Sequence, residues 1–235
     1  MTTSNRDYKL YDLLMATFVT VLLISNLLSS AKIIDLQASL GEIPLIFDAG
    51  TLVFPLSYIF GDILTEVYGF RRGRRVIWTG FAASLLMGFF VWLAGILPGE
   101  SLWAAYAGQE AYDAILGGIS GLIIASLAAY LFGEFTNSAI LSRMKIWTQG
   151  RYVWARTIGS TLGGQAVDTS IFVLIATWLG VFMPDQALPL IVTNYLFKVG
   201  IEVLLTPVTL ITIKAVKRIE REDHYDYNIS LNPFL

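Results

Sequence analysis

Six long apolar stretches, separated by short polar segments, restrict what this chain can fold into. They are approximately 10–31, 50–69, 75–97, 114–137, 157–182 and 188–213. The hydrocarbon core of a bilayer is about 30 Å thick, so an α-helix needs about 20 apolar residues to cross it. Only 14% of the residues are charged, against about 25% in soluble domains. The sequence therefore predicts an all-α integral membrane protein, with six transmembrane helices in a single transmembrane domain over residues 1–235.

The lysine and arginine residues predict the orientation of these helices. Of the 16 Lys and Arg residues, all except Lys32 and Lys198 flank the apolar stretches on one side. They are Arg6 and Lys9; Arg71, Arg72, Arg74 and Arg75; Arg143, Lys145, Arg151 and Arg156; and Lys214, Lys217, Arg218 and Arg221. Because basic loops stay in the cytoplasm, we expect both termini to be cytoplasmic.

Three crossings in each half mean that any repeat of the first half in the second would be inverted. Asn26 lies near the end of the first stretch and Asn137 near the end of the fourth. Asp62 in the second stretch has a counterpart in Asp168 of the fifth. These similarities leave open a 3+3 inverted repeat.

The residue inventory excludes several kinds of site. There is no cysteine, and the one histidine, His224, lies in the polar C-terminal tail. Thiolate or histidine metal sites and a cysteine nucleophile within the membrane are thereby excluded. We expect no metal, no cofactor and no enzymatic activity. We also expect the tail to be poorly ordered beyond about residue 222.

Ionisable residues within the apolar stretches are the main functional signal. A charge at the bilayer centre costs at least ~2.5–3.5 kcal/mol, so each must face protein or water. Helical spacing places these residues on stripes with other polar and aromatic side chains. The stripes are Tyr58, Asp62 and Glu66; Gln165, Asp168 and Phe172; and Asn194, Lys198 and Glu202, with Glu134 expected near the inner end of the fourth helix. Their similar depth predicts a central hydrated binding cavity.

A purely structural interpretation remains for part of this set. Lys198 and Glu202 are one helical turn apart and could pair to lock helix packing. Such a pair would leave Asp62, Glu66 and Asp168 unexplained. Pro55 and Pro207 lie within the apolar stretches and predict kinks near these charges.

The chain resembles the queuosine precursor transporter family, which is also described as a vitamin uptake transporter family. The residues that carry the resemblance are NLLSSAKI at 26–33, AGTLVFPLSYIFGDILTEVYGFRRGRRVIW at 49–78 and NYLFKVGIEVLLTP at 194–207, with a weaker match in GQAVDTSIF at 164–172. Together they extend over about residues 10–215.

The resemblance implies uptake of 7-cyano-7-deazaguanine and 7-aminomethyl-7-deazaguanine across the bacterial inner membrane. Carboxylates accept hydrogen bonds from a guanine-like edge, amides complement its carbonyl, and aromatic rings stack on its plane. We therefore expect a substrate site made of Asp62, Glu66, Asp168, Gln165, Asn26, Asn194, Tyr58 and Phe172, with Lys198 and Glu202 as a coupling network. We expect a 7-deazapurine and the lipid bilayer as partners, no nucleic acid, and allow for a homodimer.

Other functions fit the residues less well. A substrate-binding subunit could depend on a separate ATPase module, since the chain has no Gly-rich phosphate loop of its own. An intramembrane aspartyl protease could use Asp62 and Asp168 as a dyad. Asp62 follows Ile59-Phe60-Gly61, however, so the GxGD signature of that class is absent. A scaffolding protein would have no reason to bury so many acids.

Overall fold

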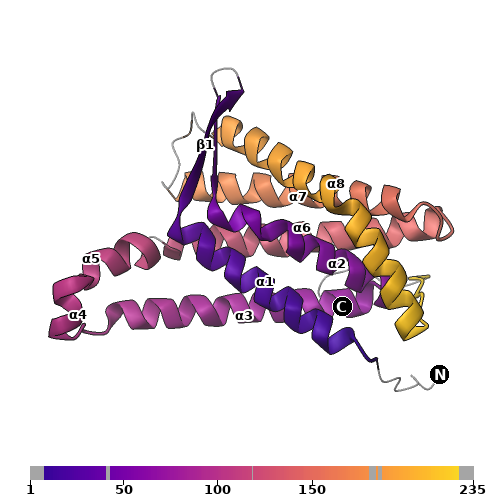
Figure 1. The fold of residues 1–235 in the computed structure, drawn as a ribbon, viewed down its shortest axis with the longest axis horizontal. Helices are drawn as coiled ribbons and strands as arrows, with labels where there is room; N and C mark the ends of the chain where they lie inside the picture. Colours follow the sequence, from indigo (N-terminus) through magenta and orange to yellow (C-terminus); the bar gives the residue numbers. More distant parts are fainter. Residues whose placement is uncertain (1–7, 41–42, 118, 180–183, 185–186, 228–235) are drawn as a thin grey trace.

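Long helices run side by side along the molecule in the computed structural model, which describes residues 8–40, 43–117, 119–179, 184 and 187–227 (Figure 1). Five of them are long and apolar enough to cross a membrane. They are α1 (Tyr11–Ala31), α3 (Phe70–Ile96), α6 (Ile119–Trp147), α7 (Val153–Trp178) and α8 (Ala187–Glu220). The expectation of a multi-pass helical membrane protein is confirmed by these five helices.

The second predicted crossing is shorter than the sequence suggested. It consists of η1 (Ala49–Leu52) followed by α2 (Phe54–Tyr68), a helix of 15 residues. At 1.5 Å per residue α2 is only about 22 Å long. Pro55 lies in its first turn, where the missing N–H costs nothing, so this proline begins α2 instead of kinking it. Every residue from Gly61 to Tyr68 is buried, so α2 lies inside the helical bundle.

The arginine-rich segment 71–75 is helical, and not the loop that was expected. Gly69 alone separates α2 from α3. Its φ angle is 85°, a backbone conformation that residues with a side chain rarely adopt, and this conformation lets the chain turn between the two helices. α3 then starts at Phe70, so the arginines occupy its first two turns. Positive charge is unfavourable at a helix N-terminus. The Asp226 carboxylate counters it by accepting a hydrogen bond of 2.8 Å from the Phe70 backbone N–H.

The last residue of α8, Glu220, and the polar residues that follow it are packed against the bundle. Glu220 accepts hydrogen bonds from the backbone N–H groups of Lys9 and Leu10, at the start of α1. Asp226 is buried and also accepts from the hydroxyl of Ser142 at 2.6 Å. The expectation of a poorly ordered tail is therefore wrong as far as Tyr227.

A β-hairpin and two short helices lie at the end of the bundle away from the N-terminus (Figure 1). β1 (Ile33–Leu40) pairs antiparallel with β2 (Ile43–Asp48), and Phe47 stacks on Phe197 of α8 with 4.6 Å between ring centroids. α4 (Ser101–Tyr106), α5 (Gly108–Tyr112) and η2 (Asp113–Gly117) connect α3 to α6. The sequence analysis did not predict the hairpin.

Pro207 lies inside α8, and α8 changes direction along its length in Figure 1. A proline inside a helix removes one backbone hydrogen bond and clashes with the carbonyl four residues earlier. The kink predicted at this position agrees with the shape of the helix.

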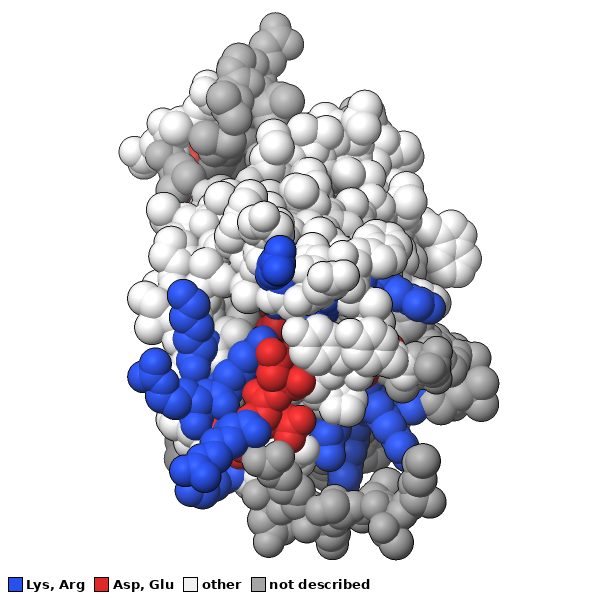
Figure 2. Space-filling model, turned by 90° about the vertical axis from the view of Figure 1, so that its right-hand side faces the viewer, with Lys and Arg blue, Asp and Glu red and all other residues white. Residues whose placement is uncertain are grey.

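Basic side chains gather at the end of the bundle opposite the hairpin. Figure 2 looks onto this end and shows lysines and arginines spread around a small acidic group. The basic residues that the sequence analysis assigned to one side of the membrane include those in the first turns of α3 and the last turns of α6 and α8.

Glycine allows α2, α6 and α7 to approach closely. A methyl group added at Gly164 of α7 would lie 2.7 Å from Cβ of Asn137 and 3.0 Å from the ring of Tyr58. Small residues at helix interfaces permit such packing in membranes. Gly200 of α8, by contrast, has nothing within 4 Å of its would-be methyl group.

We expect Gly164→Ala to destabilise the protein and Gly200→Ala to leave it unchanged or slightly more stable. Overpacking at the first site should cost about 1–3 kcal/mol, whereas alanine at the second gains up to about 1 kcal/mol of helix propensity. Thermal unfolding of both purified variants in detergent checks this pair. Equal unfolding midpoints would contradict the close packing of α7 on α2 and α6.

Candidate functional site

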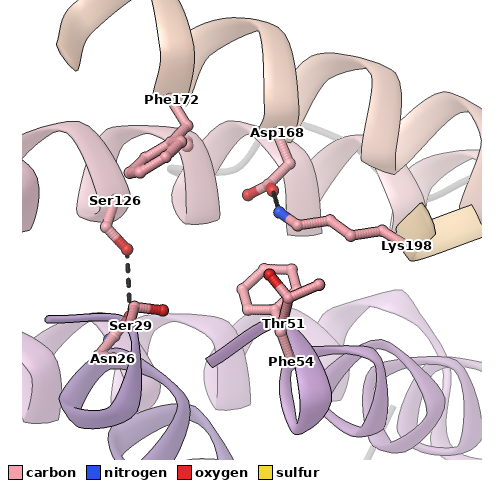
Figure 3. Close-up of a pocket in the computed structure, with 9 residues that line it drawn as sticks. Asn26, Ser29, Thr51, Phe54, Ser126, Asp168, Phe172 and Lys198 are labelled. Atoms are coloured by element: carbon pink, nitrogen blue, oxygen red, sulfur yellow. Dashed lines mark hydrogen bonds and ion pairs between the residues drawn. The ribbon is translucent and has the colours of Figure 1, made fainter. Parts of the chain in front are cut away.

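A polar pocket lies between the helices in the half of the bundle that is nearer the hairpin (Figure 3). The empty space in the pocket and its open mouth together is about 360 Å³. Helices α1, α2, α6, α7 and α8 and the turn η1 all contribute side chains. The lining residues are Asn26, Ser29, Thr51, Phe54, Ser126, Ala129, Asp168, Phe172 and Lys198.

An ion pair between α7 and α8 forms one wall of this pocket. Lys198 Nζ donates to Asp168 Oδ2 at 2.9 Å, and the side chains are 11% and 4% exposed. The same ammonium group lies 4.2 Å from the ring centroid of Phe54. A carboxylate and an aromatic face therefore stabilise the buried lysine charge. The pair presents a hydrogen-bond donor and an acceptor side by side to the pocket.

The amide of Asn26 and the hydroxyl of Ser126 form the opposite wall. Asn26 Oδ1 accepts a hydrogen bond from Ser126 Oγ at 3.1 Å, and Asn26 Nδ2 donates to Ser84 Oγ at 3.4 Å. In Figure 3 Phe172 approaches from α7, and Phe54 lies on the other side of the gap with Thr51. The pocket thus has aromatic surfaces on two sides and polar groups at its ends.

A buried polar layer lies below the pocket, toward the basic end of the bundle. Asn137 Nδ2 donates to Asp62 Oδ1 at 2.7 Å, and Gln165 Nε2 donates to Glu202 Oε1 at 2.6 Å. The four side chains come from α6, α2, α7 and α8, so the layer crosses the whole bundle. Glu202 therefore bonds to Gln165, and Lys198 bonds to Asp168. The pairing of Lys198 with Glu202 that the structural interpretation assumed is not formed.

Glu66 lies one turn beyond Asp62 and belongs to an ionic cluster at the basic end of the bundle. Its carboxylate accepts from Arg156 Nε at 3.1 Å, from Arg156 Nη2 at 2.5 Å and from Lys217 Nζ at 2.6 Å. Lys145 Nζ donates to the backbone carbonyl of Glu66 at 2.6 Å. We call Glu66, Lys145, Arg156, Lys217 and Asp223 the ionic cluster.

The segment after α8 completes this cluster. Asp223 lies 2.5 Å from Lys145 Nζ and 2.8 Å from Lys217 Nζ. Partial burial raises the pKa of the Asp223 carboxyl, but hydrogen bonds from both lysines outweigh it, so this pKa lies below its ordinary value. The ionised form is therefore favoured, and it bridges α6 to α8 across the end of the bundle.

The structure brings some of the expected site residues together and separates others. Asn26, Asp168, Phe172 and Lys198 line the pocket, whereas Tyr58, Asp62, Gln165 and Glu202 are buried below it. Glu66 is engaged in the ionic cluster, and Asn194, a half-buried residue of α8, does not line the pocket.

Several polar and aromatic residues of the site were missed. The pocket also uses Ser29, Thr51, Phe54 and Ser126, which carry no sequence signal because single hydroxyls and phenylalanines are common in membrane helices. Glu134 was noticed but placed wrongly. Because α6 continues to Trp147, Glu134 lies at its middle and not near its inner end.

Comparison with known proteins identifies relatives among transporters. The model of the family described as "Putative vitamin uptake transporter" matches residues 48–212. A "Probable queuosine precursor transporter" of Bacillus subtilis is 28% identical over 205 residues, which is 87% of this chain and 84% of the relative. Relatives from Haemophilus influenzae ("Probable queuosine precursor transporter") and Escherichia coli ("Queuosine precursor transporter") are 26% and 25% identical, over 66% of this chain and 63% and 67% of their own lengths. No solved structure matches.

We expect Asp168→Asn to destabilise the protein strongly, because it leaves the Lys198 ammonium buried without its counter-charge. Breaking a buried pair in this way costs about 3–5 kcal/mol. The double variant Asp168→Asn with Lys198→Met removes both charges and should recover most of the loss. Thermal unfolding of the purified variants measures both effects. If the double variant is as unstable as the sum of the two single variants, the two residues do not act as a pair.

Proposed function

Because this chain belongs to the putative vitamin uptake transporter family, we propose that it takes up queuosine precursors across the bacterial inner membrane. The substrates are planar 7-deazaguanines, of which 7-cyano-7-deazaguanine and 7-aminomethyl-7-deazaguanine are the two expected forms. The observation that carries this proposal is the pocket in which Asp168 and Lys198 lie between two aromatic side chains. The names of the three relatives support the same class of substrate.

The chemistry of the pocket suits a guanine-like base. Such a base has an N–H donor next to a carbonyl acceptor on one edge, and the Asp168–Lys198 pair offers an acceptor next to a donor. Phe54 and Phe172 can stack on the two faces of the ring. Asn26 supplies an amide at the far end of the pocket. Asp62 and Gln165, one layer below, remain within the proposed substrate path.

Transport proceeds by alternating access around this pocket. The ionic cluster closes the basic end of the bundle, while the pocket lies in the other half. A substrate that enters from the hairpin end reaches the cytoplasm only after Glu66 separates from Arg156 and Lys217. The ion pairs of Glu66 with Arg156 and Lys217 support the assignment of this cluster as the inner gate.

In the membrane, the basic end of the bundle faces the cytoplasm, together with both termini. The turn η1 and α2 together make the second of six crossings, which the remaining helices shield from lipid. A 3+3 inverted repeat, with α1 to α3 matching α6 to α8, and a homodimeric state remain predictions of the sequence.

Two other versions of the function differ in the source of energy. A separate ATPase module could drive uptake, or a proton could move with the substrate through Glu202 or Glu66. Glu66 is a poor proton carrier in this structure because two cationic side chains already neutralise its carboxylate.

Uptake by the purified chain alone in liposomes without ATP supports a self-sufficient transporter. Uptake only with an added ATPase would assign the chain to the subunit class.

The proposed orientation predicts which residues a membrane-impermeant thiol reagent can reach. The chain has no cysteine, so single cysteines can be placed without a background. Ala105→Cys in α4 should react in intact cells, because α4 lies at the outer end. Arg151→Cys, between α6 and α7, should react only after the membrane is permeabilised. The reverse pattern of labelling would contradict the orientation.

We expect Asp62→Asn and Asp168→Asn each to abolish uptake of the precursor while the protein still inserts in the membrane. Uptake is measured with labelled 7-cyano-7-deazaguanine in cells that cannot make it, and membrane fractions report insertion. Glu110→Gln on exposed α5 is the matched control, with uptake unchanged. Normal uptake by both aspartate variants would refute this substrate path.

A further inference from the structure

Glu134 is a buried carboxyl group for which the structure provides no stabilising partner. Its exposure is 0%, and neither carboxyl oxygen has a hydrogen-bond partner among the residues that the structure describes. It lies at the middle of α6. An ionised carboxylate in such a place loses its hydration and gains no cation or N–H donor in return, which costs several kcal/mol.

Close packing seals Glu134 on the side of α2. A methyl group added at Gly61 of α2 would lie 2.9 Å from Glu134 Oε2, so only a glycine leaves room for the carboxyl group at this point. On the preceding residue, Gly133, an added methyl group would lie 2.7 Å from the Tyr58 hydroxyl and 2.7 Å from Cβ of Asp168. Glu134 therefore follows a residue that packs closely against Asp168, one of the residues that line the pocket.

The ionisable groups around Glu134 are mostly acidic. Asp62 and Tyr58 face it from α2, Asp168 from α7 and Glu202 from α8, and Tyr130 lies one turn away on α6 itself. The nearby cation, Lys198, is bound to Asp168. Negative neighbours disfavour a further negative charge, so the surroundings of Glu134 favour its neutral, protonated form.

The other acids of the bundle differ from Glu134 in having partners. Asp62 is bonded to Asn137, Asp168 to Lys198, Glu202 to Gln165 and Glu66 to Arg156. Each of these partners can stabilise a carboxylate without a bound proton. Within the described part of the chain, Glu134 is the carboxyl group in these spans whose two oxygens both lack a hydrogen-bond partner.

We propose that Glu134 is the proton-binding site of this transporter, and that the proton it holds moves inward with each substrate molecule. This inference rests on the proposed function. The hydroxyl of Tyr58 also lacks a partner among the described residues, and it lies near Gly133, the residue before Glu134. A water molecule next to this hydroxyl would be needed to carry a proton from the pocket to Glu134.

Release of the proton is linked to the inner gate through α2. Gly61 seals Glu134, and Glu66 of the same helix holds the ionic cluster closed. When α2 moves and Glu66 leaves Arg156, Gly61 moves off the Glu134 carboxyl group. Water from the cytoplasm then reaches Glu134, which ionises and delivers its proton. Opening of the gate and loss of the proton are thus one event.

The test compares wild type with Glu134→Gln, which keeps the shape of the protonated side chain but binds no proton. The first measurement is infrared spectroscopy of the purified protein, without substrate. The carbonyl stretch of a protonated carboxylic acid should be present at neutral pH in wild type and lost in Glu134→Gln. Glu110→Gln, whose carboxyl group is exposed, should leave this band unchanged.

The second measurement uses liposomes loaded with unlabelled 7-cyano-7-deazaguanine. Wild type should exchange labelled for unlabelled substrate, and an inward proton gradient should stimulate its net uptake. Glu134→Gln should keep the exchange and lose the stimulation. Glu110→Gln, the matched control with an exposed carboxyl group, should keep both the exchange and the stimulation.

The outcomes separate this inference from the proposed function. Exchange by wild type with no effect of the proton gradient overturns the role of Glu134 and leaves the transporter intact. Stimulation that persists in Glu134→Gln, or a carboxylic acid absorption that is as strong in the variant as in wild type, also overturns it. Failure of wild type to bind or exchange any 7-deazaguanine overturns the proposed function, while the infrared band still decides whether Glu134 holds a proton.

Discussion

A carboxylate inside a membrane protein needs a cation, a hydrogen-bond donor or a proton, and the structure depends on how each acid meets this need. Glu66 is bound by cationic side chains, Asp168 pairs with a lysine, and Asp62 and Glu202 accept hydrogen bonds from amides. These different partners divide the bundle into three layers along its length. The outer layer is a pocket with a paired charge, the middle layer holds amide-bonded acids, and the inner layer is a closed ionic cluster.

The arrangement of charge follows from this division. The cations at the inner end outnumber the acids that they hold, so Arg156, Lys145 and Lys217 stabilise both Glu66 and Asp223. In the middle layer the acids meet neutral amides, and Glu134 meets none. In the proposed function, a transported base therefore leaves a site with a balanced charge, passes acidic groups and reaches an end of the bundle that is lined by cations.

The sequence predicted the long helices well because their signals are local. Apolar length identified α1, α3, α6, α7 and α8, and period-four spacing identified the face of α7 that carries Asp168. The predicted ends of the helices were less accurate. In the structure α3, α6 and α8 extend into basic segments that the sequence analysis assigned to loops or to the tail. The aliphatic stems of arginine and lysine pack on apolar surface while their charges reach water, so basic residues do not end these helices.

Partners distant in sequence could not be predicted from spacing. Glu66 and Arg156 are both isolated charges in the sequence, and they become a pair only because α2 and α7 both pack against α6 and α8. The same holds for Asp226, whose role at the start of α3 requires the chain to return across the bundle. Glu134 was misjudged for a simpler reason, because its depth was inferred from a helix end that was placed too early.

The segment after α8 also constrains how the protein is made. The ionic cluster needs Lys217 and Asp223, and Asp226 caps α3. Ribosomes synthesise these residues after α1 to α7 and most of α8. Until they emerge, Glu66 lacks one of its cations and the inner end of the bundle is incomplete. The ionic cluster is therefore completed only after the earlier helices have been inserted in the membrane. A nascent chain that stalls after α7 has buried acids that are only partly neutralised. Membrane quality-control proteases can recognise such a state.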